Sequence, residues 1–248
     1  MTALLAATGL ARSYGSLRAV DRVDLDLSAG ARRALIGPNG AGKSTLLNLI
    51  AGTVRPSAGR IRLAGRDITR AGPAARARLG VARTFQTPAV LDSLTALENL
   101  VVAAWRHTGA GRRWRESRRR EPARLGLLDT LGLGAQAHLT AGSLSHGQRR
   151  LLEIAVALAA EPSVLLLDEP AAGLGDADLP RLLAALRRLP AEMAVLLVEH
   201  NQDLVTAFAD TVTVLHHGQV LATGTPQEIH VHPAVAEVYL GTPQAVSR

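Results

Sequence analysis

Residues 37–45 read "GPNGAGKST" and match the pattern G-x-x-x-x-G-K-[ST], with Gly37, Gly42, Lys43 and Ser44 at its fixed positions. Glycines let the backbone turn so that successive N–H groups point at phosphate oxygens, and a helix that follows adds the positive end of its dipole. The lysine ammonium can reach the β- and γ-phosphates, and the serine hydroxyl can bind Mg²⁺. This segment therefore predicts a binding site for a nucleoside triphosphate.

Lys43 is the only lysine in the sequence, so 27 of the 28 basic residues are arginines. A lysine placed at random among the basic positions would fall on this site about one time in 28. The arginine fork is larger and planar, and it does not replace a compact ammonium inside a tight glycine loop. The distribution of basic residues supports the phosphate-binding interpretation.

Length and composition limit the class of protein. With 248 residues the chain can hold one large domain or a domain with a sizeable subdomain. It has no cysteine, which excludes disulfides and thiolate metal sites. No apolar run approaches 18 residues, and "MTALLAATGL" lacks the basic region of a signal peptide, so any membrane span is expected on another chain. The net charge of +7 would suit a polyanion, but aromatics are scarce, and a bias toward Arg and Ala is the favoured explanation.

Strand patterns surround the glycine-rich segment. The alternation in "VDLDLSAGARRALIG" (23–37) predicts a strand, a turn at Ala29 and Gly30, and a second strand that enters the loop. The residues after the loop, "STLLNLIAG" (44–52), have helical spacing that ends at Gly52. Further strands are predicted within 59–68, 79–85, 163–170, 193–200 and 210–218.

Residues 88–159 have a different pattern. Apolar residues at helical spacing occur at Leu94, Leu97, Leu100 and Val101, from Leu125 to Leu133, and from Leu151 to Ala159. The simplest organisation is one domain in which a helical insert interrupts an α/β frame. We predict a nucleotide-binding core from 1–87 and 160–225, a helical subdomain over 88–159, and a C-terminal extension over 226–248.

A second site motif follows a buried-strand pattern at "VLLLDE" (164–169). Asp168, at the carboxyl end of the predicted strand, is placed to bind Mg²⁺ directly or through water. Glu169, one residue further, is placed to polarise the attacking water. A hydrophobic run followed by two acids is common, and the glycine loop some 120 residues upstream makes it specific.

The segment "LSHGQ" (144–148), about 20 residues before Asp168, resembles the signature of ABC-type ATPases, whose usual form is L-S-G-G-Q. Other elements of that family match in order: Tyr14 near the start, Gln86 in "RTFQ" and His200 in "LVEH". The resemblance covers the entire chain. It implies a P-loop NTPase fold, with a RecA-like α/β core, an antiparallel β subdomain and an inserted helical subdomain.

The resemblance also implies roles for individual residues. ATP binding is assigned to Tyr14, Gly37, Pro38, Asn39, Gly40, Ala41, Gly42, Lys43, Ser44 and Thr45. Mg²⁺ binding is assigned to Ser44, Gln86 and Asp168, and catalysis to Glu169, His200 and Gln86. Tyr14 could stack on adenine or serve ordinary packing. Gln86 could sense the γ-phosphate or be a polar strand end, and His200 could hold Glu169 and water in line.

The signature residues Ser145, His146, Gly147 and Gln148 are expected to act on ATP held by a second subunit, so that two head-to-tail protomers enclose two nucleotides. His146 departs from the usual glycine, and we expect an intact site. In "AAGLGDADL" (171–179), where many relatives have S-A-L-D, Asp176 or Asp178 could serve across the dimer.

Five segments resemble the ATP-binding subunits of branched-chain amino acid importers of the LivG type: "ARTFQ", "LTALENL", "RRLLEIAVALA", "DEPAAGL" and "HPAVAEVYLGTP". The expected partners are a second ATPase subunit, identical or a sister chain, transmembrane permease subunits and, indirectly, an extracytoplasmic binding protein. The expected location is the cytoplasmic face of the membrane, with ATP and Mg²⁺ as ligands and no nucleic acid.

Alternatives remain within the same family. Related ATPases serve urea or amide uptake and lipid export, and a soluble ABC ATPase acting on nucleic acid is a further class. The Arg-rich segment 112–121, "RRWRESRRRE", is interpreted as a solvated helix face. The alternative interpretation is that it contacts anionic lipid head groups or a partner.

Overall fold

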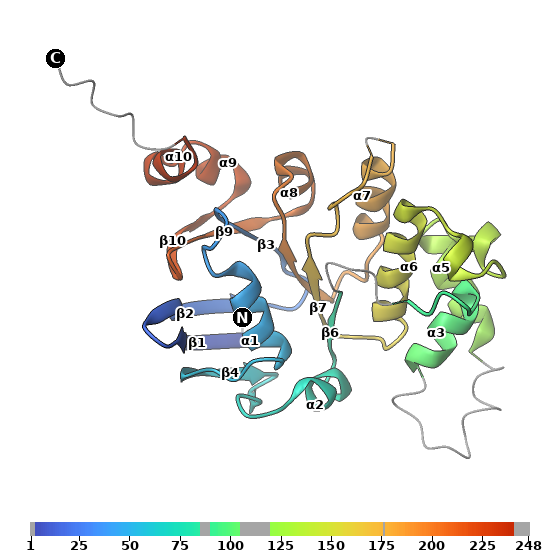
Figure 1. Ribbon diagram of the computed structural model, residues 1–248, viewed down its shortest axis with the longest axis horizontal. Coiled ribbons are helices and arrows are strands. Elements are labelled where there is room, and N and C mark those ends of the chain that lie inside the picture. Colours follow the sequence, from blue (N-terminus) through green and yellow to red (C-terminus); the bar gives the residue numbers. More distant parts are fainter. Residues whose placement is uncertain (1–2, 85–89, 105–119, 176, 241–248) are drawn as a thin grey trace.

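The computed structural model describes residues 3–84, 90–104, 120–175 and 177–240. A six-stranded sheet with strand order β10-β9-β3-β8-β7-β6 runs through its middle (Figure 1). These strands are β3 (Arg32–Ile36), β6 (Val81–Arg83), β7 (Val164–Asp168), β8 (Ala194–Val198), β9 (Thr211–His216) and β10 (Gln219–Gly224). All neighbouring pairs from β9 to β6 are parallel, and β10 pairs antiparallel with β9.

The register of the parallel strands brings three carboxyl ends together. Val198 at the end of β8 pairs with Leu35 on one side and with Asp168 on the other. The loops that follow β3, β7 and β8 therefore leave the sheet at one edge, which is where open α/β sheets bind ligands.

A second, antiparallel sheet has the order β2-β1-β4-β5. Its strands are β1 (Leu5–Tyr14), β2 (Leu17–Leu27), β4 (Ala58–Leu63) and β5 (Arg66–Asp67). On β2 the alternation is visible as buried Val23, Leu25 and Leu27 with Asp24 and Asp26 exposed between them, which fits a sheet with one solvated face. The predicted strands within 59–68 are confirmed as β4 and β5.

Strand β7 is buried on both of its faces. Val164 and Leu166 belong to the hydrophobic core that lies against the antiparallel sheet and α1 (Lys43–Ala51). Leu165 and Leu167 point the other way, into the core that contains the helical insert. The continuous apolar run before Asp168 is thus the run expected of a parallel strand covered on both sides.

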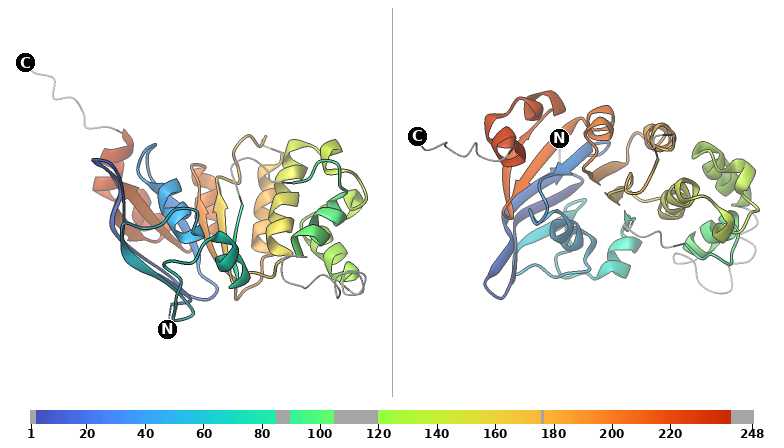
Figure 2. Two further views of the ribbon diagram at one scale, coloured as in Figure 1. Left: turned by 60° about the horizontal axis from the view of Figure 1, so that its bottom comes forward. Right: turned by 45° about the horizontal axis from the view of Figure 1, so that its top comes forward.

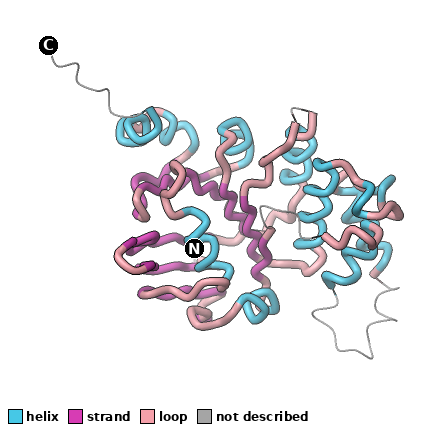
Figure 3. Tube along the Cα trace, in the orientation of Figure 1, coloured by secondary structure: helices cyan, strands magenta, loops and turns pink. Residues whose placement is uncertain are grey.

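Helices α3 (Ala96–Ala104), α5 (Glu121–Thr130) and α6 (His146–Leu158) form the helical part of the chain. Figure 2 shows them on the opposite side of the central sheet from the antiparallel sheet, and Figure 3 shows the strands gathered away from them. Two short 3-10 turns, Gly134–Gln136 and Ala141–Ser143, connect α5 to α6. The domain boundaries predicted for this part stay predictions.

The helix limits differ from the apolar pattern in two places. Leu94 lies in a bend before α3, because Thr95 and Glu98 form reciprocal hydrogen bonds that cap the helix start. α5 ends at Thr130, so that Leu131 and Leu133 are buried but lie beyond the helix. Apolar spacing identifies buried positions, and local capping sets the ends.

The remaining helices are α2 (Pro73–Arg78), α7 (Leu179–Arg187), α8 (Gln202–Phe208), α9 (Pro226–His230) and α10 (Pro233–Leu240). α9 contacts β9 and β10, and α10 contacts β10, at one end of the central sheet (Figure 1). No helix among the described residues is long and apolar enough to cross a membrane.

A buried arginine closes the carboxyl end of α1. Arg76 is 1% exposed, and its guanidinium donates hydrogen bonds to the carbonyls of Leu49 and Ile50 in α1, and to those of Thr69 and Ala71. Burial lowers the pKa of Arg76 to about 10. The cation satisfies carbonyls that the helix leaves without an internal partner.

Candidate active site

The loop between β3 and α1 has a shape that requires glycine. Gly37 has a φ of +150° and Gly42 a φ of +104°. A Cβ at Gly37 would collide with the carbonyl oxygen of Leu215, and one at Gly42 with that of Ala19. The loop is therefore held between β9 and β2 in one conformation, with its amides available at the start of α1.

Lys43 begins α1, and its ammonium is folded back into the loop. Nζ donates to the carbonyl oxygens of Gly37 at 2.7 Å and Pro38 at 3.0 Å, and the residue is 5% exposed. Burial lowers the pKa of Lys43, while the charges of Glu169 and Asp168 act in the opposite direction. The ammonium thus faces the carboxylates of Asp168, which ends β7, and Glu169, which follows it.

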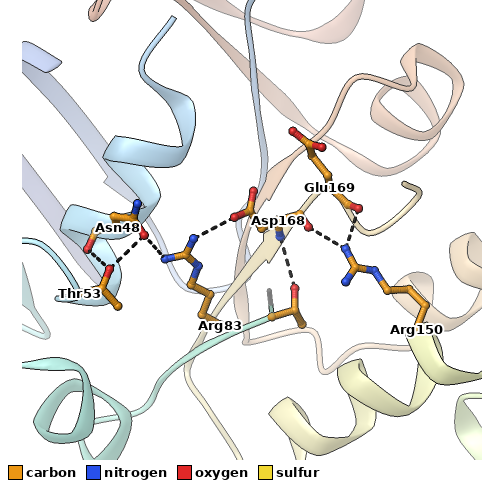
Figure 4. A network of polar contacts seen from close by, with 7 residues as sticks. Asn48, Thr53, Arg83, Arg150, Asp168 and Glu169 are labelled. Carbon is orange, nitrogen blue, oxygen red and sulfur yellow. Dashed lines mark hydrogen bonds and ion pairs between the residues drawn. The ribbon is translucent and has the colours of Figure 1, made fainter. Parts of the chain in front are cut away.

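Asp168 is tied to α1 through an arginine that the motifs do not include. Nη2 of Arg83 lies 2.9 Å from Oδ2 of Asp168, and Nη1 of Arg83 donates to Oδ1 of Asn48 at 2.6 Å (Figure 4). Asn48 also accepts from the hydroxyl of Thr53 at 3.0 Å. Arg83 therefore connects the end of β6 to both α1 and β7.

The second oxygen of Asp168 has the properties of a metal ligand. Oδ1 is buried and has no hydrogen-bond partner among the described residues. Ser44, in the first turn of α1, has an exposed side chain. No cluster of three or more His, Cys, Asp or Glu side chains that could hold a metal occurs in the described ranges. Mg²⁺ needs no such cluster, since it takes one or two protein oxygens with water and substrate phosphates, and these two residues fit it.

Glu169 and His200 meet at the ends of neighbouring strands. Nε2 of His200 lies 3.3 Å from Oε1 of Glu169. Glu169 has a left-handed backbone with φ of +47°, and its N–H donates to the carbonyl of Val198 at 2.9 Å. This conformation costs about 1–3 kcal/mol for a residue other than glycine. Glu169 thus leaves the strand in a left-handed turn, and its carboxylate lies beside His200.

A buried carboxylate, Glu199, supports both of these residues. Oε1 accepts from the N–H of Ala171 at 2.7 Å, and Oε2 accepts from the N–H groups of His200 at 2.7 Å and Asn201 at 3.0 Å. The side chain is 3% exposed. Glu199 thus links the segment after Glu169 to the segment after β8. In the sequence, Glu199 is marked only as an acidic residue within "LVEHN" (197–201).

The signature segment forms the start of α6. Ser145 is the N-cap, and its side chain and that of Gln148 form a capping box. His146 Nε2 lies 3.4 Å from the carbonyl oxygen of Ala172. A Cβ at Gly147 would lie 2.6 Å from Oδ2 of Asp178, so that this carboxylate packs on the signature of its own chain.

The matches to known proteins extend along the chain. A family model described as ABC transporter matches residues 20–172. The branched-chain amino acid transport ATP-binding protein BraF of Pseudomonas aeruginosa is 39% identical, over 96% of this chain and 98% of its own length. LivG of Salmonella typhimurium is 38% identical and LivG of Escherichia coli 37%, each over 96% of this chain and 98% of its own length.

The chain belongs to the ABC transporter family. It is a nucleotide-binding ATPase subunit of a transport system, and the predicted fold class is confirmed. A second model, described as "Branched-chain amino acid ATP-binding cassette transporter", matches residues 219–245, from β10 onward.

Solved ABC cassettes have the same fold. A nucleotide-free ATP-binding cassette of an ABC transporter superposes with a TM-score of 0.84 at 29% identity, covering 97% of this chain and all of that one. The ADP conformation of the cassette MJ1267 superposes with a TM-score of 0.85 at 30% identity, covering 98% and 100%.

The structure brings only some of the predicted site residues of this ABC subunit together. Lys43, at the start of α1, lies near Asp168, Glu169 and His200 at the carboxyl ends of β7 and β8. Tyr14 ends β1 with a 44% exposed side chain, and the Arg12 guanidinium lies 4.5 Å from its ring centre. Gln86 and Asp176 lie outside the described residues, as do residues 112–119 of the Arg-rich segment. Arg120 pairs with Glu161 at 3.1 Å.

Proposed function

We propose that this chain is the ATP-hydrolysing subunit of an importer for branched-chain or related amino acids. The observation that carries hydrolysis is the meeting of Lys43, Asp168, Glu169 and His200 at one edge of the sheet. The substrate class is supported by the names of the relatives, which are called high-affinity branched-chain amino acid transport ATP-binding proteins, and by the family model that matches residues 219–245.

In the proposed mechanism, ATP lies over the glycine loop with its phosphates at the start of α1. Lys43 exchanges the carbonyls of Gly37 and Pro38 for β- and γ-phosphate oxygens, with the amides of 38–45 around them. Tyr14 lies against adenine. Ser44, Asp168 and Gln86 would hold Mg²⁺, which supplies charge neutralisation on the phosphates.

Glu169 is proposed as the residue that accepts the proton of the attacking water. Its carboxylate is partly exposed, and the nearby His200 keeps it oriented while donating toward the γ-phosphate. Arg83 neutralises one oxygen of Asp168 and leaves the other for the metal. Each role uses a group that is already at the strand ends.

The signature is proposed to act on the ATP of a second ATPase subunit. The N-terminus of α6 presents backbone N–H groups, and Ser145 presents a hydroxyl beside them. Within its own chain this segment lies against Ala172 and Asp178, which follow Glu169. A head-to-tail dimer, of identical or sister subunits, would bring the partner's phosphates to this helix end.

A groove offers a docking place for the permease. It has a volume of about 550 Å³ and lies among α1, α2, β6, α3 and α6, with small apolar residues such as Ala77, Ala103 and Ala157 in its lining. Arg83, which pairs with Asp168, and Glu153, which pairs with Arg150, also line it. We propose that a cytoplasmic helix of a transmembrane permease subunit occupies it, which places the chain at the cytoplasmic face of the membrane.

An uptake assay tests the substrate class. In a strain lacking this gene, the wild-type chain should restore uptake of labelled leucine, and Glu169→Gln should not. If the chain restored uptake of urea or of another amide but not of leucine, the proposed substrate class would be wrong. Co-purification of a polytopic membrane chain is expected, and RNA in its place would contradict the transport role.

A further inference from the structure

The guanidinium of Arg150, in α6, donates hydrogen bonds to the backbone of residues 168–170. Its Nη2 donates to the carbonyl oxygens of Asp168 at 2.7 Å and Glu169 at 2.6 Å (Figure 4). Its Nε donates to the carbonyl oxygen of Pro170 at 3.1 Å. The residue is 2% exposed. One guanidinium therefore holds three successive carbonyls, which begin with the two acids proposed for metal binding and catalysis.

The charge of Arg150 is balanced within the same helix. Nη1 pairs with Oε2 of Glu153, which is 3% exposed. Charged donors form stronger hydrogen bonds than neutral ones, and a buried cation is tolerated when a carboxylate accompanies it. Glu153 thus permits a full guanidinium charge directly behind the carboxyl end of β7.

One of the residues that Arg150 binds, Glu169, has the strained backbone conformation. Glu169 has its φ of +47°, and its N–H is bound by Val198 on the side of β8. Arg150 binds its carbonyl from the side of α6. Such a conformation persists when the surroundings hold it from several sides. With Arg150 removed, the carbonyls of Asp168, Glu169 and Pro170 each lose a hydrogen bond that holds this turn.

Arg150 also lies on the helix that starts at the signature. Ser145 caps α6, and Arg150 follows it within the first turns of the same helix. A helix transmits a displacement of its start as a rigid unit. Contact of the signature with a partner's nucleotide would therefore shift the Arg150 side chain and, with it, the carbonyls of Asp168 and Glu169.

We propose that Arg150 is a positioning residue, which sets the geometry of Asp168 and Glu169 and connects it to the signature helix. This inference deepens the proposed function and rests on the roles proposed there for the two acids. The competing explanation is that Arg150 and Glu153 form a buried ion pair that only stabilises the fold.

The test measures ATP hydrolysis by the purified full-length chain. Arg150→Met combined with Glu153→Gln removes the guanidinium without leaving a buried carboxylate unpaired. We expect kcat to fall about 10- to 100-fold, as for small misplacements of a catalytic group, with KM for ATP changed less than about twofold. Thermal unfolding under the assay conditions shows whether the variant is folded.

Two controls separate position from stability. Arg149→Met makes the same substitution at the next residue of α6, whose side chain bonds Asp92 and the carbonyl of Ala141, and should keep kcat within about twofold. Glu153→Gln alone leaves the three carbonyl contacts and should also keep kcat. If it lost as much activity as the double variant, the ion pair and not the grip on the carbonyls would be responsible, and the inference would be wrong.

A milder variant covers the case in which the double variant does not fold. Arg150→Lys keeps the charge beside Glu153 but replaces the planar fork by a point donor that cannot hold all three carbonyls. It should unfold near the wild-type temperature and still show a reduced kcat. Wild-type kcat in a folded Arg150 variant would overturn the inference. Glu169→Gln reports on the proposed base separately, because normal turnover in that variant would refute its role without involving Arg150.

Discussion

The imidazole Nε2 of His200 lies 3.3 Å from Oε1 of Glu169, and the distance is set by strand register. Asp168 and Val198 are paired across β7 and β8. Glu169 directly follows Asp168, and His200 follows Val198 after one intervening residue. The N–H of Glu169 also donates to the carbonyl of Val198. Because the backbone is fixed here by the sheet, conservative substitutions at this pair change its chemistry more than its position.

Glu169→Gln should bind ATP, accumulate as an ATP-bound dimer and hydrolyse ATP about 10²- to 10⁴-fold more slowly, since the amide cannot accept the proton of water. Phosphate release measures the rate, and size-exclusion chromatography with and without ATP measures the dimer. Turnover at the wild-type rate would remove Glu169 from the role of base.

Lys43→Arg should lose most ATP binding although the charge is kept. The guanidinium is too large for the space in which Nζ reaches Gly37 and Pro38. The wild-type chain should gain about 2.7 kcal/mol of stability at an ATP concentration of 100 times its Kd, and this variant should gain much less. Thermal shifts measure the difference, and Lys43→Arg with an unchanged ATP response contradicts our account of the loop. The opposite exchange at the exposed Arg78, Arg78→Lys, is the matched control.

Glu199→Gln should lower the free energy of unfolding by about 1–3 kcal/mol and slow hydrolysis. The amide nitrogen would face an N–H of Ala171 or those of His200 and Asn201, leaving buried donors without an acceptor. Urea unfolding and steady-state kinetics measure the two effects. The same exchange at Glu192, which is exposed on the neighbouring segment, should change neither. Equal behaviour of the two variants would show that Glu199 does not organise this region.

ATP affinity should fall with rising pH before an ordinary lysine would lose its charge. Burial lowers the pKa of Lys43 below its usual 10.5 in the folded chain. In the alkaline window below 10.5 the unfolded chain then binds more protons at this residue, so Lys43 makes stability rise with pH while binding weakens. Titration of ATP binding between about pH 8 and pH 10.5 tests this. An affinity that stays constant over that range contradicts it.

Arg76→Met should destabilise the chain by about 2–4 kcal/mol, because four carbonyls, two of them at the end of α1, lose a charged donor. Chemical denaturation measures the loss. Arg78→Met, in the same helix but exposed, should lie within about 0.5 kcal/mol of the wild type. A loss at Arg78 as large as that at Arg76 would show that helix propensity, and not the buried hydrogen bonds, determines the effect.

Much of the site could be predicted because its parts are contiguous in the sequence. The glycine loop, the acids at the carboxyl end of β7 and the signature each have their own pattern, and strand order then brings the first two together. The burial of β7 on both faces could also be expected from its unbroken apolar run. Asp178 shows the limit, since its contact with Gly147 depends on how a loop folds back.

Arg83, Arg150 and Glu199 could not be found in this way. Arg83 and Asp168 are 85 residues apart in the chain, and nothing local marks Arg83 or Arg150 among the 27 arginines as buried. Arg83 and Arg150 donate to a side-chain amide, carboxylates and backbone carbonyls, and Glu199 accepts from backbone N–H groups, all of which any segment can supply. Only the packing of α6, β6 and β8 around β7 reveals them.

Because Lys43 is the only lysine, reactions specific for lysine act at one position of the chain. A lysine-specific protease has one target bond in this sequence, between Lys43 and Ser44, and it lies in the first turn of α1. Its cleavage follows the population of molecules in which that turn is open. Cleavage at this one bond, which gives two fragments and is followed in time, therefore reports opening of the phosphate loop, and protection by a nucleotide reports its occupancy without any label.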